Sequence, residues 1–384
     1  MAEIDWHKCK FLESAENLKP LVKKRFGREP SSSVAREIAA CLLQGRLFYE
    51  AAASSPLEIR PLQQFYGMIG FAKAIIVASR LNALSTLRPA HGLTDISAGN
   101  SRIADLRLRI ESSGTFQEFN DVMAPLVRLC YLDNSSRFQI VPLPSANSAE
   151  LRGVELSLPE ILGRVPILES LYQLTFGEEA YTSSLDLQAA FQGDSDFRIR
   201  INDSQLFADR KSLKQIVGRW RSRFPFLRLW RLQSAQHGWG YSTIYFRNVR
   251  NRGIDEFSEA YLGYQDGMFQ ELAVPDDANV RFPLEEAFSP VAGCYTGANI
   301  YAVSPIGGFY VSEFSIQYLG LFLLSSLMRY RPQIWTHAIS RSSVPGEPAD
   351  DKALSLIERF LDLNGMAIPE MVVQVLNPYE DDFV

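Results

Sequence analysis

Two stretches with almost no charged residues decide the fold: PLQQFYGMIGFAKAIIVAS at residues 61–79 and FSIQYLGLFLLSSLM at residues 314–328. Lys73 is the only charge in the first stretch, and the second contains none. Apolar residues of the first stretch follow the 3.6-residue period, but its opposite face is apolar too, which predicts a helix over 61–84 that is buried nearly all round. The second stretch predicts a buried helix over 313–328. Because such a helix needs an apolar partner, we expect the two to pack together.

These two helices are predicted to lie in a protein core rather than in a membrane. The stretches hold 19 and 15 residues, at or below the ~20 that a bilayer requires, and both contain Gln. The opening MAEIDWHKCKFLES shows no apolar signal-peptide core. The four cysteines are scattered without zinc spacing, which is typical of reduced thiols. We therefore expect a cytoplasmic protein with no membrane partner, no metal and no cofactor.

The pattern changes from helical to strand-like in the middle of the chain. Helices are predicted at 34–53 and 115–132, before short β-branched and aromatic runs that are bounded by turn residues. Those runs predict strands at 138–143, 154–158, 197–201, 242–249, 295–303 and 308–311. Further helices are expected at about 159–173, 210–223 and 351–363. Short connections favour antiparallel pairing of the strands.

The predicted fold is therefore α+β, with a helical layer formed by the N- and C-terminal segments and packed with a mostly antiparallel central β region. The sequence divides into a helical N-terminal region (1–135), a β-rich central region (136–312) and C-terminal helices (313–384). The last region is expected to pack back on the first.

Lys73 is the most unusual residue of the first apolar stretch. A lysine in the middle of a buried helix is costly unless its ammonium group is paired. It could form a buried ion pair with Glu313 or Glu50, or reach the surface along its apolar stem. Alternatively, it could bind the phosphate or carboxylate of a ligand. Gly70, on the same side of the helix, would allow another backbone to approach closely.

Residues 210–252 form the strongest compositional anomaly, and we call them the basic block. They hold eleven Arg and Lys residues and no Asp or Glu, in a chain whose net charge is −5. They also hold three of the five tryptophans. Basic groups neutralise phosphates, and aromatic rings stack on bases. The block therefore predicts binding of nucleic acid or another polyanion. The predicted contact residues are Arg210, Lys211, Lys214, Arg219, Arg221, Arg223, Trp230 and Arg231.

Two other interpretations of the basic block remain open at this point. It could bind an acidic surface of a partner protein. It could also dock on the protein's own acidic surface, with its aromatic side chains in the core.

The sequence contains no Walker A, GxGxxG, GxSxG or HExxH motif. One weak catalytic pattern remains, because His337 follows Arg331 by six positions and the stretch resembles the Arg-x(4–6)-His pattern of HEPN ribonucleases. Such a pair could bind a scissile phosphate through Arg331 and move a proton through His337 without a metal. Pro332 suggests that the two residues lie on different helices. The alternative is that the basic residues here interact with a helix C-terminus.

The run PLQQFYGMIGFAKAIIVASR, followed by HGL at 91–93, resembles the YaaC-like family of bacterial intracellular proteins, whose pattern is P-L-x-x-Y-Y-G-x-x-x-x-A-K-A followed by H-G-L. The matching residues are Tyr66, Gly67, Ala72, Lys73, Ala74, His91, Gly92 and Leu93, with Phe65 where Tyr is common. The run LGLFLLSSLMRYRPQIW is similar to the family's closing R-Y-x-P-x-x-W through Arg329, Tyr330, Pro332 and Trp335. The likeness covers about 45–95 and 313–377.

The resemblance implies no established reaction. For some members it implies a place among bacterial phage-defence or stress genes, which would suit contact with nucleic acid in antiviral defence. Lys73, His91 and Arg329 become the candidate ligand-binding residues, because burial alone would not demand those residue types.

The leading functional hypothesis is a protein without chemistry of its own that binds nucleic acid or a phosphorylated ligand within a larger bacterial assembly. Two alternatives are a metal-independent HEPN-like ribonuclease that uses Arg331 and His337, and a protein-interaction scaffold with a protein partner.

Overall fold

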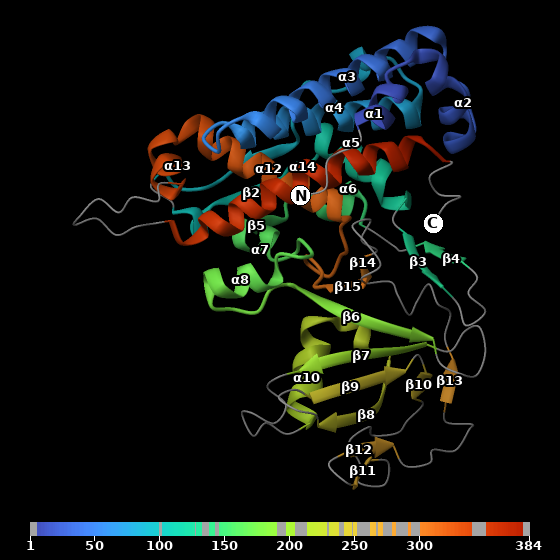
Figure 1. Cartoon of the computed structure of the whole chain (residues 1–384), viewed down its shortest axis with the longest axis vertical. Coiled ribbons are helices and arrows are strands. Elements are labelled where there is room, and N and C mark those ends of the chain that lie inside the picture. The colour runs from blue at the N-terminus through green and yellow to red at the C-terminus, as the bar shows by residue number, and fades with distance from the viewer. Residues whose placement is uncertain are drawn as a thin grey trace. The chain divides into compact units, whose positions relative to one another are not determined.

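The structure is a computed structural model, drawn in Figure 1. It describes residues 6–99, 102–126, 128–132, 138–142, 146–189, 197–203, 213–228, 230–237, 242–247, 249–251, 262–265, 268–271, 279–281, 291–292, 300–339 and 351–378. The chain divides into two units, each of which is taken in turn below. The helical unit comprises Met1–Leu126, Ser145–Ala180 and Val311–Val384. The sheet unit comprises Val127–Pro144 and Tyr181–Tyr310.

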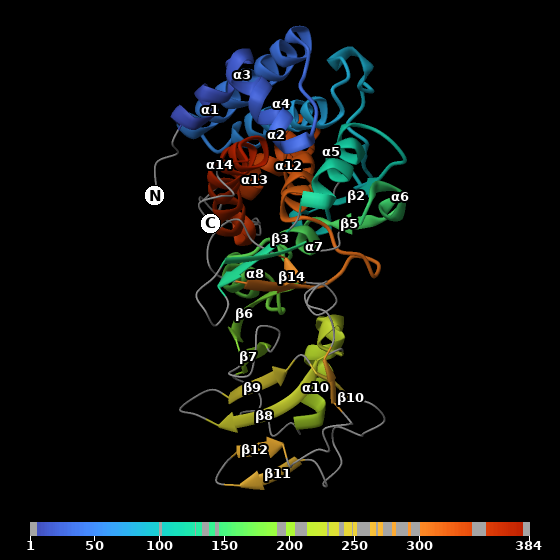
Figure 2. The same ribbon diagram turned by 90° about the vertical axis from the view of Figure 1, so that its right-hand side faces the viewer.

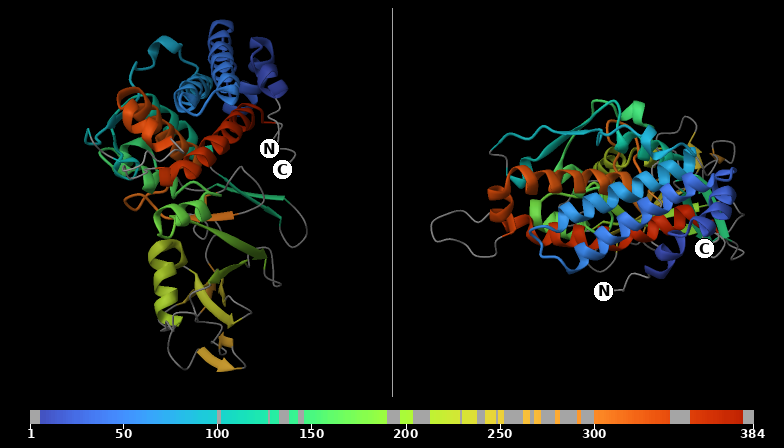
Figure 3. Two further views of the ribbon diagram at one scale, coloured as in Figure 1. Left: turned by 60° about the vertical axis from the view of Figure 1, so that its left-hand side comes forward. Right: turned by 90° about the horizontal axis from the view of Figure 1, so that it is seen from above.

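Four long helices form the core of the helical unit. They are α3 (Ser32–Ser54), α4 (Arg60–Arg80), α12 (Glu313–Tyr330) and α14 (Leu354–Leu376). The helices α3, α12 and α14 all pack against α4, and they run side by side in the right-hand view of Figure 3. Because α4 has neighbours on several sides, almost every residue from Gln64 to Ala78 is buried. This explains why α4 lacks a polar face.

Glycines let α3 and α4 approach each other closely. A Cβ atom on Gly70 would lie 2.9 Å from the backbone nitrogen of Gly45 and 3.1 Å from the carbonyl oxygen of Cys41. A Cβ on Gly67 would meet the ring of Tyr49 at 2.5 Å. The close backbone approach predicted at Gly70 is therefore confirmed, and its partner is α3.

Aromatic rings join α4 to α12, as the two apolar stretches predict. The ring of Phe65 meets those of Tyr318 and Phe322 edge-on, with centroids 5.8 and 5.9 Å apart. All three side chains are buried. Edge-to-face pairs of this kind each contribute about 0.5–1.5 kcal/mol beyond the burial of their area.

A chain of buried polar side chains joins three of the core helices. The Tyr49 hydroxyl of α3 donates to Asn364 Oδ1 of α14 at 2.8 Å, and Asn364 Nδ2 donates to Gln317 Oε1 of α12 at 3.0 Å. Gln317 Nε2 then donates to Glu313 Oε1 at 3.1 Å. Because buried polar groups need partners, this chain fixes the register of α3, α12 and α14.

Shorter elements complete the helical unit. A three-stranded antiparallel sheet has the order β1 (Leu93–Asp95), β2 (Arg107–Ile110) and β5 (Glu155–Ser157). Figure 2 shows this part of the unit, in which α5 (Thr115–Met123) follows β2 along the chain and α6 (Ser148–Leu151) precedes β5. The other helices are α1 (Trp6–Leu12), α2 (Ala15–Phe26), α7 (Leu158–Leu162), α8 (Glu169–Phe176) and α13 (Pro332–Ile339).

The sheet unit is built on an antiparallel sheet with the strand order β11-β12-β8-β9-β7-β6-β15-β14. In chain order these strands are β6 (Thr182–Ala189), β7 (Phe197–Asp203), β8 (Arg231–His237), β9 (Ser242–Arg247), β11 (Leu262–Gln265), β12 (Met268–Glu271), β14 (Val291–Ala292) and β15 (Ile300–Val303). Two further pairs are β3 (Arg128–Leu132) with β4 (Phe138–Pro142), and β10 (Val249–Asn251) with β13 (Asn279–Arg281). The helix α10 (Leu213–Arg223) joins this unit through Trp220, whose Nε1 donates to Asp203 of β7 at 2.6 Å.

The α+β prediction is confirmed, with helices from both ends of the chain in one unit and antiparallel strands in the middle. Several element limits differ from the sequence expectation. The predicted helix 115–132 ends at Met123, and β3 begins at Arg128. The predicted helix 159–173 is split into α7 and α8 at Pro166, where no helix can continue easily. Residues 306–309 form a tight turn through Gly307 and Gly308 rather than the predicted strand.

No helix in the described part of the chain combines the length and apolar content that crossing a bilayer requires.

Candidate ligand-binding site

The ring of Phe65 is the centre around which the candidate residues gather. Phe65 is fully buried on α4. The His91 ring meets it at 5.3 Å between centroids and at a 60° interplanar angle, and lies 6.2 Å from the ring of Phe322. The Arg329 guanidinium lies 6.0 Å from the Phe65 centroid. Phe65 therefore brings His91 and Arg329, from distant parts of the sequence, to one place.

A rigid loop places His91 against Phe65. Gly92 has φ of +80°, which a side chain would strain, and a Cβ there would also clash with the amide of Gln117. Gln117 Nε2 donates to the carbonyl oxygens of Gly92 and Glu111 at 2.7 and 2.8 Å. The backbone N–H of Phe116 donates to the His91 carbonyl at 3.0 Å. The first turn of α5 thus fixes the HGL segment, and the glycine after His91 has a structural reason.

Arg329 lies in the last turn of α12 and is half-buried. Its Nε donates to the carbonyl of Ser325 at 3.2 Å, and its guanidinium lies 5.0 Å from the ring centroid of Tyr330. Only one of its five donor N–H groups is engaged in these contacts. Among the described residues, no acceptor contacts the remaining donors.

Lys73 completes a set of three basic side chains on this part of the helical unit. Burial, and then the positive charges of Arg329 and Lys73, hold the pKa of the His91 imidazole below its ordinary value. Lys73 also acts on the Cys41 thiol of α3, whose pKa burial raises to about 11 against the opposing effect of the lysine charge. Burial and these two positive charges therefore favour the neutral form of the His91 imidazole.

Within the described residues, neither Lys73 nor Arg329 forms an ion pair with a carboxylate. Of the two counter-ions that the sequence suggested for Lys73, Glu50 accepts a hydrogen bond from Arg46 at 2.7 Å, and Glu313 accepts one from Gln317. The basic cluster of Lys73, His91 and Arg329 thus has excess positive charge, which a bound anion would balance.

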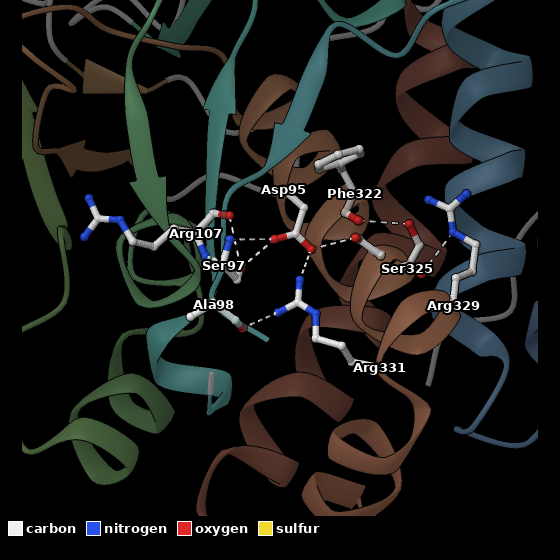
Figure 4. Close-up of polar contacts among 9 residues, drawn as sticks. Asp95, Ser97, Ala98, Arg107, Phe322, Ser325, Arg329 and Arg331 are labelled. Carbon is white, nitrogen blue, oxygen red and sulfur yellow. Dashed lines mark hydrogen bonds and ion pairs between the residues drawn. The ribbon is translucent and has the colours of Figure 1, made fainter. Parts of the chain in front are cut away.

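Arg331, only two positions further along, has a different environment. Figure 4 shows Arg331 directed toward Asp95 at the end of β1, whereas Arg329 leaves α12 in another direction. Asp95 pairs with Arg331 and also accepts hydrogen bonds from the Ser97 and Ser326 hydroxyls at 2.6 and 2.7 Å. Burial raises the pKa of Asp95, but these hydrogen bonds outweigh burial, so the pKa lies below its ordinary value. We call this group the Asp95 knot, because it ties β1 to the end of α12.

The structure does not bring the two predicted catalytic residues together. Arg331 follows the last residue of α12, and His337 lies on α13 with an exposed side chain, so they belong to different helices as Pro332 suggested. The Arg331 guanidinium is held by Asp95 and by the Ala98 carbonyl, and no hydrogen bond joins it to His337. Ribonuclease activity stays a prediction, without a shared cleft to support it.

Three arginines in the described part of the basic block make contacts within the sheet unit. Arg219 pairs with Asp203, and Arg221 donates to the carbonyls of Leu227 and Trp230 at 3.1 and 2.8 Å. Arg223 donates to the carbonyl of Thr182 at 2.7 Å. These three guanidinium groups therefore bridge α10, the segment after it, and strands β6 and β7.

Trp230 is 1% exposed, so in this conformation its ring has no face for a base. Arg210 and Lys211 lie outside the described residues, as do the side chains of Lys214 and Arg231. Nucleic-acid binding through the basic block stays a prediction, and it would depend on the block's remaining residues.

Sequence reasoning missed two residues that organise these sites. Asp95 has the local signal Asp-x-Ser, in which the carboxylate accepts from the backbone N–H two residues later, at 3.0 Å for Ser97. Gln117 has no such signal, because its role depends on a carbonyl 25 residues earlier in the chain.

The same segments connect the chain to known proteins. The model of the YaaC-like protein family matches residues 10–376. The chain belongs to the YaaC-like family. The match includes Phe65, Lys73, His91, Arg329 and the Asp95 knot, so the basic cluster of this YaaC-like protein lies entirely within the family region. No curated protein and no solved structure shows significant similarity to it.

Proposed function

We propose that this YaaC-like protein binds an anionic ligand, in particular a phosphorylated one, at the basic cluster of Lys73, His91 and Arg329. The observation that carries the proposal is that His91 and Arg329 meet at the buried ring of Phe65, where the charge of Lys73 also acts on His91, and that neither Lys73 nor Arg329 has a carboxylate partner among the described residues. Half-buried cations without partners are costly, and an anion with several acceptor oxygens would remove that cost.

The chemistry of the three groups fits a phosphate. Arg329 offers N–H groups in a planar fork, which suits two oxygens of a phosphate, and Lys73 adds a mobile point charge. The neutral His91 imidazole can donate one N–H to a third oxygen. None of these groups is a nucleophile poised beside a base, so the site supports binding rather than a covalent reaction.

Titration calorimetry with inorganic phosphate tests this proposal. Replacing Arg329 with Gln or Lys73 with Met removes a charge-assisted contact of ~1.5–3 kcal/mol, so each variant should bind phosphate about tenfold or more weakly. The control is Lys352→Gln, which removes the same charge at an exposed position of the short helix Asp351–Ala353. It should leave binding unchanged.

Equal affinity for phosphate in Arg329→Gln, Lys73→Met and Lys352→Gln would refute the site. The absence of saturable phosphate binding by the wild-type protein would refute the function itself.

A further inference from the structure

Two tyrosine rings lie at the surface beside the basic cluster. Tyr330 is 69% exposed and Tyr66 is 38% exposed, so both count among the exposed large side chains of the described residues. Tyr66 follows Phe65 on α4, and its ring stacks on Phe48 with centroids 5.7 Å apart. Tyr330 follows Arg329 at the end of α12. Since large aromatic rings are usually buried, two exposed ones around a cationic site are a feature of recognition.

The Arg329 guanidinium connects the exposed ring of Tyr330 to the interior of the site. It lies 5.0 Å from the Tyr330 centroid and 6.0 Å from the Phe65 centroid. A cation held near the ring strengthens the attraction for a flat, electron-rich partner. Tyr330, Arg329, Phe65 and His91 therefore follow one another as neighbours, from an exposed ring to the basic groups.

We infer that the ligand of this site is a nucleoside monophosphate, whose base stacks on Tyr330 while its phosphate contacts Arg329, Lys73 and His91. This inference rests on the proposed function, because it specifies the group attached to the phosphate. Tyr330 rather than Tyr66 is the stacking residue, since Tyr66 already stacks on Phe48 and is less exposed. The same chemistry is offered by a free nucleotide and by the 5′-phosphorylated end of a strand.

The first experiment compares adenosine 5′-monophosphate with ribose 5-phosphate, which has the same phosphate and sugar but no base. Stacking of a base on an aromatic side chain contributes ~1–3 kcal/mol, so the wild-type protein should bind the nucleotide about tenfold or more tightly. In Tyr330→Leu this preference should disappear, with the affinity for ribose 5-phosphate unchanged. Tyr330→Phe keeps an aromatic plane and should keep the preference.

Phe11→Ala is the matched control, because it removes an exposed aromatic ring (53% exposed) from α1 of the same unit. Circular dichroism checks that each variant is folded. Equal wild-type affinity for the two compounds would overturn the inference, as would a full nucleotide preference in Tyr330→Leu. If the inference is overturned in either way but Arg329→Gln still weakens binding of both compounds, the proposed phosphate binding stands and only the nucleotide assignment fails. If neither phosphorylated compound binds, both fail.

A second arm separates the two sources of the ligand. A short oligonucleotide with a 5′-phosphate is compared with the same strand ending in a 5′-hydroxyl. Binding of the phosphorylated strand alone, at the affinity of the nucleotide, identifies a strand end as a ligand. Binding of the free nucleotide but neither strand identifies a small-molecule site. If the two strands bind equally and Arg329→Gln weakens neither, nucleic acid binds elsewhere on the protein. That result would contradict the strand-end assignment.

Discussion

At the scale of single residues, His91 is the member of the basic cluster that can change its charge near neutral pH. Burial and the charges of Arg329 and Lys73 keep its pKa below the ordinary value of 6.5 in the free protein. An anion placed between these groups would favour the charged imidazolium and raise that pKa. Ligand binding and protonation of His91 are therefore linked.

We predict that bound phosphate raises the pKa of His91, because the imidazolium is favoured beside the anion. Nuclear magnetic resonance titration of the His91 ring should show its pKa rising when phosphate is added. His337, which is exposed on α13, provides the comparison within the same spectra. Identical His91 titration curves with and without phosphate would place the anion elsewhere.

At the scale of elements, the Asp95 knot joins a strand to the end of a helix. Asp95 and Arg331 have side chains that are 13% and 11% exposed, so removing one partner leaves a charge with little access to water. Breaking such a pair costs about 3–5 kcal/mol when it is buried, and replacing both partners costs less. The pair therefore specifies where α12 ends more than it adds to overall stability.

We predict that Asp95→Ala lowers the free energy of unfolding of the helical unit by roughly 3 kcal/mol, and that adding Arg331→Met restores part of the loss. Urea denaturation of the two single variants and the double variant measures the coupling. Because the folded-state pKa of Asp95 is lowered, its contribution is present above the unfolded pKa near 4 and is lost as the pH falls through the folded value. Additive effects of the two substitutions would show that the contact is not coupled.

At the scale of the whole molecule, the helical unit is assembled from three separate parts of the chain. The helix α4 has no polar face, and its cover comes partly from α12 and α14 near the other end of the sequence. Burial of each large apolar side chain in this contact contributes about 1.5–3 kcal/mol. The N-terminal helices cannot bury this surface by themselves.

A chain that ends at residue 310 is therefore predicted to lose the cooperative unfolding transition of its N-terminal helices and to expose an apolar face. Thermal circular dichroism and binding of a hydrophobic dye would show the change. Supplying residues 311–384 as a separate polypeptide should restore the transition. A cooperative helical transition in the shortened chain alone would contradict this dependence.

Much of the fold follows from local patterns in the sequence. The 3.6-residue period and the absence of charge predict α4, α12 and their contact, and the alternation of β-branched residues predicts β7 and β9. The strand β6 was missed because its sequence, TSSLDLQA, is mostly polar. It is a strand because its backbone pairs with β7 on one side and β15 on the other. The helix α2 continues through Pro20 although proline usually breaks a helix, because Pro20 and Glu16, one turn earlier, are both exposed to water.

The candidate site was predictable only in part. The residue types Lys73, His91 and Arg329 could be selected from the sequence, but the approach of His91 and Arg329 to Phe65 depends on the packing of α4 against α12. The role of Arg331 could not be predicted, because a basic residue at a helix end suits a ligand, a helix dipole and a carboxylate equally well. Only the position of Asp95 distinguishes these roles.

The division of the helical unit among three parts of the sequence has a consequence for biosynthesis. A ribosome releases α3 and α4 long before α12 and α14, and the segment between them contains the whole sheet unit. At about 5–20 residues per second, the apolar faces of the early helices stay uncovered for roughly ten seconds or more. A nascent chain of this kind is a natural client for a chaperone that covers apolar surfaces, and slow translation would lengthen the time for which those surfaces are exposed.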